Sequence, residues 1–407
     1  ARSAHPLRGG GQMSHRDSPD RLANLPGPDA PDETAVTFGG EQVDESIYYA
    51  SQWQLIWWRF RRHRLAIGSG VLLALIYILS IFSGFFSPYS PSQRFDQYQQ
   101  APPMRIRLLN EGRFIGPHYF GLERELDTET FRYEFVYDES QVYPLRLFVR
   151  GEPYEFLGLF PTDIHFFGTP GESPPPLLLF GADRLGRDIF SRTLNGGRIS
   201  LSIGLIGVLL SFVLGVALGG ISGYFGGVVD EIVQRTVDFL ISIPQLPLWM
   251  ALSAALPRDW PVLRTYFAIT IILSIVGWTS LARVVRGKLL SLREEDYALA
   301  AQAAGAGKRR IIFKHLLPGF TSHLIVSITL AVPGMILAET ALSFIGLGIQ
   351  PPAVSWGTLL QDAQDIVAIA HQPWQLIPAI FVIATVLLFN FIGDGLRDAA
   401  DPYSEAN

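Results

Sequence analysis

Six long apolar stretches, each free of charge or carrying a single acid, dominate the pattern along the chain. They cover residues 65–87, 199–229, 239–257, 265–282, 324–349 and 373–393. A helix needs about 17–25 mostly apolar residues to cross the hydrocarbon core of a bilayer. The pattern therefore predicts an all-α integral membrane protein with six transmembrane helices.

Residues 51–64, SQWQLIWWRFRRHR, precede the first stretch and mix tryptophan with arginine. Tryptophan rings favour the headgroup region of a membrane, and arginine is attracted to anionic lipid. We interpret this segment as a basic interfacial helix that contacts membrane lipid.

The charges between the apolar stretches predict how the chain is oriented. Cytoplasmic loops carry an excess of Lys and Arg. Besides the arginines before the first span, a loop at 283–323 holds eight such residues: Arg283, Arg286, Lys288, Arg293, Lys308, Arg309, Arg310 and Lys314. We expect both segments inside, and six spans then place both termini in the cytoplasm.

The segment between the first two spans, residues 88–198, is predicted to be an extracytoplasmic insertion. Its stretches FRYEFVYD (131–138) and LRLFVRG (145–151) alternate apolar and polar residues, as short strands do. We predict a small β-rich subdomain at about 100–168. Its acidic residues, such as Glu123 and Glu125, are interpreted as solvated surface.

The ends of the chain are predicted to be tails. Residues 1–50 have few apolar residues and no apolar run of the kind found in a secretory signal, so we expect a disordered cytoplasmic tail. Residues 397–407 are expected to form a short cytoplasmic tail. The chain begins at Ala1 and its first methionine is Met13, which fits a misassigned start or an added segment over residues 1–12.

A polar, alanine-rich loop between two spans is the segment around which we expect the protein to work. Residues 293–304 are nearly all good helix formers, and Gly305 and Gly307 are expected to end that helix with positive φ. A second helix is predicted from Lys308 to His315, and Pro318 marks the entry to the next span. A hairpin of this kind is typical of a surface that binds a soluble partner.

Glycine and proline within the spans predict packing and bends. Small residues about four apart let helices approach closely in a membrane, and the second span has Gly204, Gly207, Gly215, Gly219 and Gly223. Proline removes a helical hydrogen bond, and such breaks are tolerated where they line a cavity. Pro244, Pro247 and Pro333 are therefore candidates for the wall of a pathway, with simple packing kinks as the alternative.

Composition agrees with a membrane protein and excludes several kinds of chemistry. The chain is 48% hydrophobic and 17% charged, below the roughly 25% charged typical of soluble domains. A net charge of −5 without one basic patch argues against nucleic-acid binding. The absence of cysteine excludes disulfides, thiolate metal sites and cysteine nucleophiles.

The chain offers no energy source of its own. Ion-coupled transporters usually carry ionisable groups within the membrane, but here Glu339 is the only clear one, and it lies near the outer end of its span. A phosphate-binding loop needs glycine six residues before its lysine and Ser or Thr after it. Gln302 and Arg309 occupy those places around Lys308. We therefore expect no ATP, metal or other cofactor on this chain, no catalytic residue, and energy supplied by another subunit.

The alanine-rich loop resembles the EAA loop of the transmembrane subunits of bacterial ABC importers. In that pattern E-A-A is followed after three residues by Gly, and then by Leu-Pro. Ala300, Ala301, Gly305, Leu317 and Pro318 stand in the matching places, while Leu299 replaces the usual Glu. That departure puts in doubt the salt bridge such a Glu would make to the ATPase, and Glu294, Glu295 and Asp296 lie just upstream.

Three further segments are similar to the C-type permeases of oligopeptide and dipeptide importers. These are GADRLGRDIFSRTLNGGRISLS (181–202), ETALSFIGLG (339–348) and GDGLRDAADPY (393–403). The resemblance covers residues 51–87 and 181–403, and implies a permease core at 199–396 that includes a coupling loop at 287–318. The insertion at about 101–175 is similar in position to that of microcin and peptide uptake permeases.

The resemblance implies a permease subunit in a bacterial inner membrane that takes up peptides or other small solutes, such as nickel complexes, sugars or opines. Its partners would be a sister permease, two ABC ATPase subunits that bind ATP and Mg²⁺, and a periplasmic substrate-binding protein. The residues expected to couple the chain to an ATPase are Glu294, Glu295, Tyr297, Ala300, Ala301, Ala304, Gly305, Gly307 and Pro318. Pro244, Pro247, Pro333 and Glu339 remain the candidates for the pathway or its hinges.

Two other classes of protein are alternatives to an ABC importer permease. An ion-coupled secondary transporter would work alone with an ion gradient, but the spans lack the charged residues that it needs. A membrane-anchored enzyme with its site in residues 101–175 would show activity in that piece alone. We expect neither.

Overall fold

The structure is a computed structural model that describes residues 52–126, 128, 133–171, 174–257, 259–364 and 370–400. The tail predicted at 1–50 lies outside these residues, as do residues 401–407 of the tail predicted at 397–407. Ile56–Asn407 form one compact unit. The predicted interfacial segment is helical, as α2 (Gln52–Arg62), and its three tryptophans are exposed.

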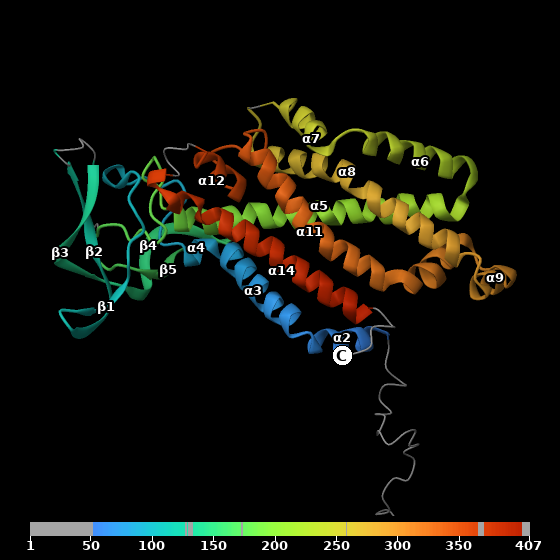
Figure 1. Ribbon diagram of the computed structural model, residues 1–407, viewed down its shortest axis with the longest axis horizontal. Helices are drawn as coiled ribbons and strands as arrows, with labels where there is room; N and C mark the ends of the chain where they lie inside the picture. Colours follow the sequence, from blue (N-terminus) through green and yellow to red (C-terminus); the bar gives the residue numbers. More distant parts are fainter. Residues whose placement is uncertain are drawn as a thin grey trace, which may run out of the picture. The chain divides into compact units, whose positions relative to one another are not determined.

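Helices make up most of the described chain, as predicted (Figure 1). Five are long and apolar enough to cross a membrane: α3 (Arg64–Ile81), α5 (Ile189–Phe225), α8 (Val262–Leu292), the run Lys308–Phe344 and the run Pro373–Ala400. The run Lys308–Phe344 ends in α11 (Thr321–Phe344), and the last run contains a 3₁₀ turn, η4 (Pro373–Leu376), and α14 (Ile377–Ala400).

The predicted span at 239–257 is not one continuous helix. α6 (Gly227–Ser242) and α7 (Gln245–Ala254) meet at an angle of 87°, so a sixth span exists only if this bent pair is counted as one. Ile243 and Pro244 between them are extended, because the residue before a proline is pushed out of the helical region. Pro247 falls in the first turn of α7, where its missing N–H would have no helical partner.

Other boundaries also differ from the prediction. α5 begins at Ile189 rather than at 199, so the insertion is shorter than 88–198. Asp188 caps this helix, because its carboxylate accepts the backbone N–H groups of Phe190 and Ser191. α3 ends at Ile81 and is followed by a short helix, α4 (Ser83–Phe86), while α14 extends to Ala400, past the predicted limit at 396.

The long helices pack as the glycine spacing predicts. α5 lies against α8, and α14 packs between α3 and α11 (Figure 1). A Cβ atom on Gly219 would lie 2.4 Å from the backbone oxygen of Ala282 in α8, and one on Gly223 would lie 2.8 Å from that of Arg286. Only glycine allows the two backbones to come this close.

The predicted β-rich insertion is present and contains two sheets. The first has the order β1 (Arg107–Asn110), β2 (Arg113–Leu126), β3 (Tyr133–Pro144), with a 3₁₀ turn, η1 (Asp96–Tyr98), before it. The second is an antiparallel hairpin of β4 (Arg146–Phe156) and β5 (Phe160–Gly168). A small core that includes Tyr119, Leu177 and Leu178 holds the first sheet to the chain that follows it.

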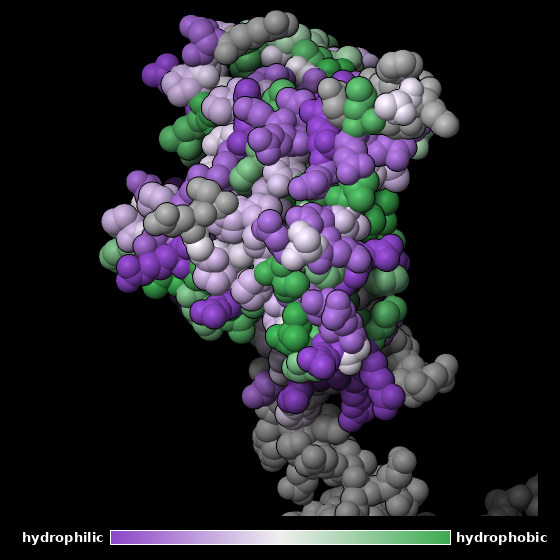
Figure 2. All heavy atoms as spheres, turned by 90° about the vertical axis from the view of Figure 1, so that its left-hand side faces the viewer, coloured by the Kyte–Doolittle hydropathy of each residue, from purple (hydrophilic) through white to green (hydrophobic). Residues whose placement is uncertain are grey.

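The face of the molecule that carries the insertion is largely hydrophilic (Figure 2). Hydrophobic side chains occur there in separate groups among the polar ones (Figure 2). The mixture fits a subdomain that meets water over most of its surface.

Candidate functional site

The alanine-rich loop forms two helical segments, although the first begins later than predicted. α8 ends at Leu292, residues 293–295 form a turn, and α9 (Asp296–Ala303) follows. Glu294 and Glu295 thus lie before the helix rather than in it. The carbonyl oxygen of Glu295 accepts the N–H groups of Ala298 and Leu299, which closes the first turn of α9.

Gly305 ends α9 as predicted, with φ at +78°. The N–H of Ala306 bonds to the carbonyl of Ala301 at 3.0 Å, and the N–H of Gly305 bonds to that of Gln302 at 3.0 Å. This pair of bonds is a Schellman motif, which needs a left-handed residue at its centre. The prediction for Gly307 was wrong, because its φ is −66°, which other residues also adopt.

One face of α9 is buried and the opposite face is free. Ala298 packs into an apolar cluster with Leu289, Ile311 and Leu316 from the flanking segments. Ala300 and Ala304 are exposed, as is most of Tyr297, while Ala301 is half-buried. Small side chains on the free face leave room for a second surface to approach the backbone closely.

Leu299, which stands where the importer pattern has Glu, is also exposed. Phe313 is more exposed still, in the segment after α9, and the sequence analysis did not single it out. Exposed large apolar residues at a candidate contact surface favour burial against a partner. The only signal in the sequence is its distance of two residues from Ile311. On a helix, that distance places Phe313 on a different side from the buried Ile311.

The segment after Gly307 is helical up to the membrane, but it is not a regular α-helix. It contains α10 (Lys308–Arg310), a π-helical turn η2 (Ile311–Leu316) and a 3₁₀ turn η3 (Leu317–Phe320) before α11. Pro318 lies at the start of η3, where its missing N–H is tolerated. Pro333 lies inside α11 and is buried.

The base of the loop is joined to neighbouring helices by an ion pair and a hydrogen bond. Arg286 of α8 bonds to both carboxylate oxygens of Asp230 in α6, each at 2.5 Å. Arg293 donates to the carbonyl of Gly223 at the end of α5, at 3.3 Å. α9 is therefore carried by a fixed base made of α5, α6 and α8.

Glu339 lies in the interior of the described chain. It is fully buried and accepts hydrogen bonds from Ser200 of α5 at 2.8 Å and from Ser343 at 2.7 Å. Ser200 in turn accepts the backbone N–H of Trp356 at the start of α12 (Trp356–Asp362). The carboxylate thus connects α5, α11 and α12.

A second buried polar cluster lies where the insertion meets α5. Arg192 pairs with Asp183 and, at 3.1 Å, with Asp362 at the end of α12. Arg187 bonds to Asp183 at 2.6 Å. Beside them, burial raises the pKa of Asp188 to about 6, although hydrogen bonds from Ser191 and Phe190 lower it. In the sequence, only the resemblance of residues 181–202 to importer permeases points to this cluster.

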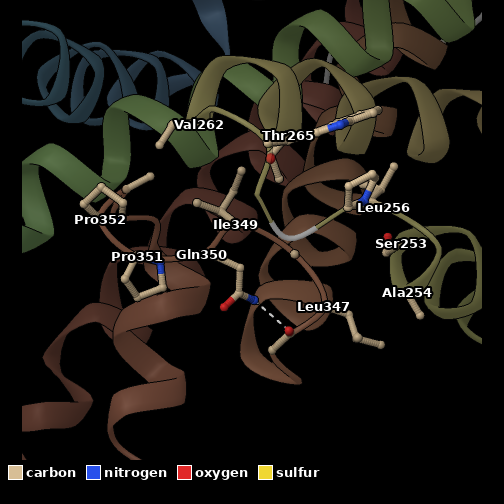
Figure 3. Close-up of a pocket in the computed structure, with 15 residues that line it drawn as sticks. Ser253, Ala254, Leu256, Val262, Thr265, Leu347, Ile349, Gln350, Pro351 and Pro352 are labelled. Atoms are coloured by element: carbon tan, nitrogen blue, oxygen red, sulfur yellow. Dashed lines mark hydrogen bonds between the residues drawn. The ribbon is translucent and has the colours of Figure 1, made fainter.

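A pocket of about 340 Å³ opens between the ends of α7, α8 and α11 (Figure 3). Residues 346–353 form one side, and Ser253, Leu256, Val262 and Thr265 lie across from them. Gln350 is held by a bond from its side-chain nitrogen to the carbonyl of Gly346, at 2.6 Å. Pro244 and Pro247 do not line this pocket.

The described residues show no group of His, Cys, Asp and Glu that could hold a metal ion. The polar clusters around Glu339 and Arg192 are made of ion pairs and hydrogen bonds between helices. Their chemistry is that of structural links, since each charged group faces an internal partner.

Comparisons with known proteins agree with the resemblance drawn from the loop. Residues 215–403 match the family described as binding-protein-dependent transport system inner membrane component, and residues 51–103 match the N-terminal TM domain of oligopeptide transport permease C. The chain is 44% identical over 224 residues to the oligopeptide transport system permease protein OppC of Bacillus subtilis (strain 168), covering 55% of this chain and 71% of that protein.

A longer match is the dipeptide transport system permease protein DppC of Lactococcus lactis subsp. cremoris (strain MG1363). It is 32% identical over 379 residues, covering 91% of this chain and 97% of that protein. Among solved structures, a chain of the inward-facing MetNI methionine ABC transporter aligns with 52% of this chain and 97% of its own, at 18% identity and a TM-score of 0.40. The chain therefore belongs to the family of binding-protein-dependent transport system inner membrane components and is a multi-pass permease subunit of an ABC importer, related to the oligopeptide and dipeptide permeases.

Proposed function

We propose that this permease forms half of the translocation pathway of an importer for peptides or similar small solutes. The proposal for the substrate is supported by the names of the relatives, which are oligopeptide and dipeptide transport permeases. A sister permease would supply the other half, and a periplasmic binding protein would deliver the substrate. Two separate ABC ATPase subunits would bind ATP and Mg²⁺, because this chain lacks a phosphate-binding loop.

The orientation we propose has both termini and the alanine-rich loop in the cytoplasm and the insertion outside. Support comes from the cationic residues of the loop, among them Lys308, Arg309 and Arg310, which are exposed in the structure. The opposite face carries the largely hydrophilic insertion (Figure 2). This arrangement places the pocket of Figure 3 on the outer side, where a delivered substrate would arrive.

The main support for a role in coupling to the ATPase is the free face of α9. Ala300 and Ala304 are exposed and small, so the helix can enter a groove on an ATPase subunit. α9 is joined through its apolar cluster to α8 and to the run Lys308–Phe344, both of which are candidate membrane spans. Movement of the ATPases on binding ATP would tilt these two spans together and open the pathway towards the binding protein.

The candidate pathway residues divide into two groups in this mechanism. Pro244 and Pro247 lie at the bend between α6 and α7, where the backbone is already broken, so they remain candidates for the pathway wall. Pro333 and Glu339 are buried between helices. We assign them the task of holding α11 in place while it moves.

Cross-linking tests the coupling role, because the chain has no cysteine of its own. Ala300→Cys and Ala304→Cys should cross-link to cysteines placed in the ATPase groove within the assembled importer, with a yield that changes when ATP binds. Ala298→Cys is the matched control, because Ala298 is buried and should not react. A complete lack of cross-links from every position between 297 and 310 would overturn the docking of this loop.

A further inference from the structure

The β4–β5 hairpin packs against α4, the short helix that follows the first span (Figure 1). The ring of Phe156 stacks on Phe82, with centroids 5.5 Å apart. Tyr154 packs on Gly84, where a Cβ atom would lie 2.4 Å from the tyrosine ring. This side of the insertion is thus fixed to the segment that leaves the membrane.

These contacts show which way the hairpin points. At its open end, Nδ1 of His165 lies 2.6 Å from the carbonyl oxygen of Ser87, which is beyond α4. Towards the tip, the partners become Gly84 and then Phe82, directly after α3. Because α3 is a candidate membrane span, the hairpin runs back towards the membrane, and its tip is the part nearest to it.

The depth of the tip follows from a cavity of about 270 Å³ beneath the hairpin. Leu157 at the tip and Ile81 at the end of α3 both line it. The turn therefore lies close to the C-terminal end of α3. Arg198 of α5 lines the same cavity, so a positive charge lies close to the turn.

The side chains at the tip are apolar and exposed. Leu157, Leu159 and Phe160 are 40%, 71% and 66% exposed. Ile78 and Ile81 on α3 are exposed at a similar depth, as expected of residues that face lipid. The apolar surface of the first span thus continues onto the hairpin.

The backbone of the turn gives independent support. Leu157 has φ at +55° and Gly158 has φ at +71°, and the N–H of Leu159 bonds to the carbonyl of Phe156 at 3.0 Å. Such a turn favours Asn, Asp or Gly, and a bulky leucine is sterically unfavourable there. Leucine in place of asparagine suits a turn whose side chains enter an apolar medium.

We propose that the tip of the hairpin, Leu157–Phe160, inserts into the outer leaflet of the membrane and holds the insertion against the lipid surface. The described turn satisfies part of its own backbone hydrogen bonding, so a shallow position at the headgroup–acyl boundary leaves few polar groups to desolvate. The assignment to the outer leaflet rests on the proposed orientation. The contact with lipid does not.

Fluorescence quenching in the intact importer tests the proposal. Leu159→Cys, labelled with an environment-sensitive dye in the full complex in nanodiscs, should be quenched severalfold more by lipids carrying a shallow nitroxide than by iodide in the water. Phe160→Cys is a second position if the first variant assembles poorly. Leu147→Cys is the matched control, because it is 61% exposed at the opposite end of the same hairpin and should respond mainly to iodide.

Two outcomes would overturn the proposal. Iodide quenching of the Leu159 label as strong as that of the Leu147 label would show that the tip is in water. Protection from iodide without quenching by the lipid nitroxide would show that a protein, either the sister permease or the binding protein, covers the tip. Neither outcome bears on the docking of α9, because that is measured by a separate cross-link.

Discussion

At the end of the core that carries the insertion, Asp183, Arg192 and Glu339 are buried and bonded to groups from other helices. At the other end, α9 meets the rest of the chain mainly through Ala298 and leaves its opposite face free. Charges buried inside the first region already have their partners. The second region keeps an uncovered surface and a glycine-dependent turn, so it is the one built to bind another subunit.

Among the changes that test this comparison, removing a buried charge should lower the free energy of unfolding most. Arg192→Met would leave the carboxylate of Asp183 buried with Arg187 as its remaining partner, and we expect a loss of about 3 kcal/mol or more in the free energy of unfolding. The unfolding midpoint of the purified complex in detergent measures it. Arg150→Met is the control, because that arginine makes an exposed pair with Asp163, worth about 0–1 kcal/mol. Equal effects from the two changes would show that the buried ion pair contributes no more to stability than an exposed one.

A change at the helix contact that joins the two ends should have a smaller effect. Gly219→Ala places a methyl group against the backbone of Ala282, and forcing the helices apart should cost about 1–3 kcal/mol. Gly220→Ala is the matched control, because its nearest neighbour would be a Leu289 methyl at 3.8 Å. The amount of assembled importer in membranes and its unfolding midpoint should fall for the first variant only. If both variants behave like the parent, α5 and α8 do not pack this closely.

The smallest change in stability is expected at the free end. Gly305→Ala forces alanine into the left-handed region, which costs about 1–2 kcal/mol and should fray the end of α9. Overall stability should change little, but the ATPase activity stimulated by substrate-loaded binding protein should fall severalfold. Gly307→Ala is the control, because its φ of −66° suits alanine and no atom would crowd the added methyl. Normal coupling in the Gly305 variant would contradict the importance of this turn.

Much of this organisation could be predicted from the sequence because it depends on patterns among neighbouring residues. Apolar length predicted the spans, glycine spacing predicted that α5 packs closely against another helix, and Gly305 predicted the end of α9. Each of these features depends on residues that are close together in the sequence.

The features that were missed depend on residues far apart or on competing signals. Asp183 and Asp362 meet at Arg192, and no pattern in a single sequence pairs them. Arg198 ended the uncharged stretch at residue 199, so the first turns of α5 were assigned to the insertion. The span at 239–257 has the right composition, but Pro244 breaks it, and apolar length alone does not show a bend.

The π-helical turn after α10 sets the rotational phase of the helical run Lys308–Phe344. Ile311 and Leu316 are five residues apart and both buried, and Phe320 and Leu324 follow at intervals of four. In a regular α-helix, residues five apart would point about 140° away from each other. In a π-turn, hydrogen bonds join residues five apart, so each turn holds more residues than a turn of an α-helix. Ile311 and Leu316 are thereby brought back towards the same side. The extra residue in the π-turn therefore sets how the run is rotated. Lys308–Arg310 face outward, and the apolar side of the same helical run packs against α8 and α9.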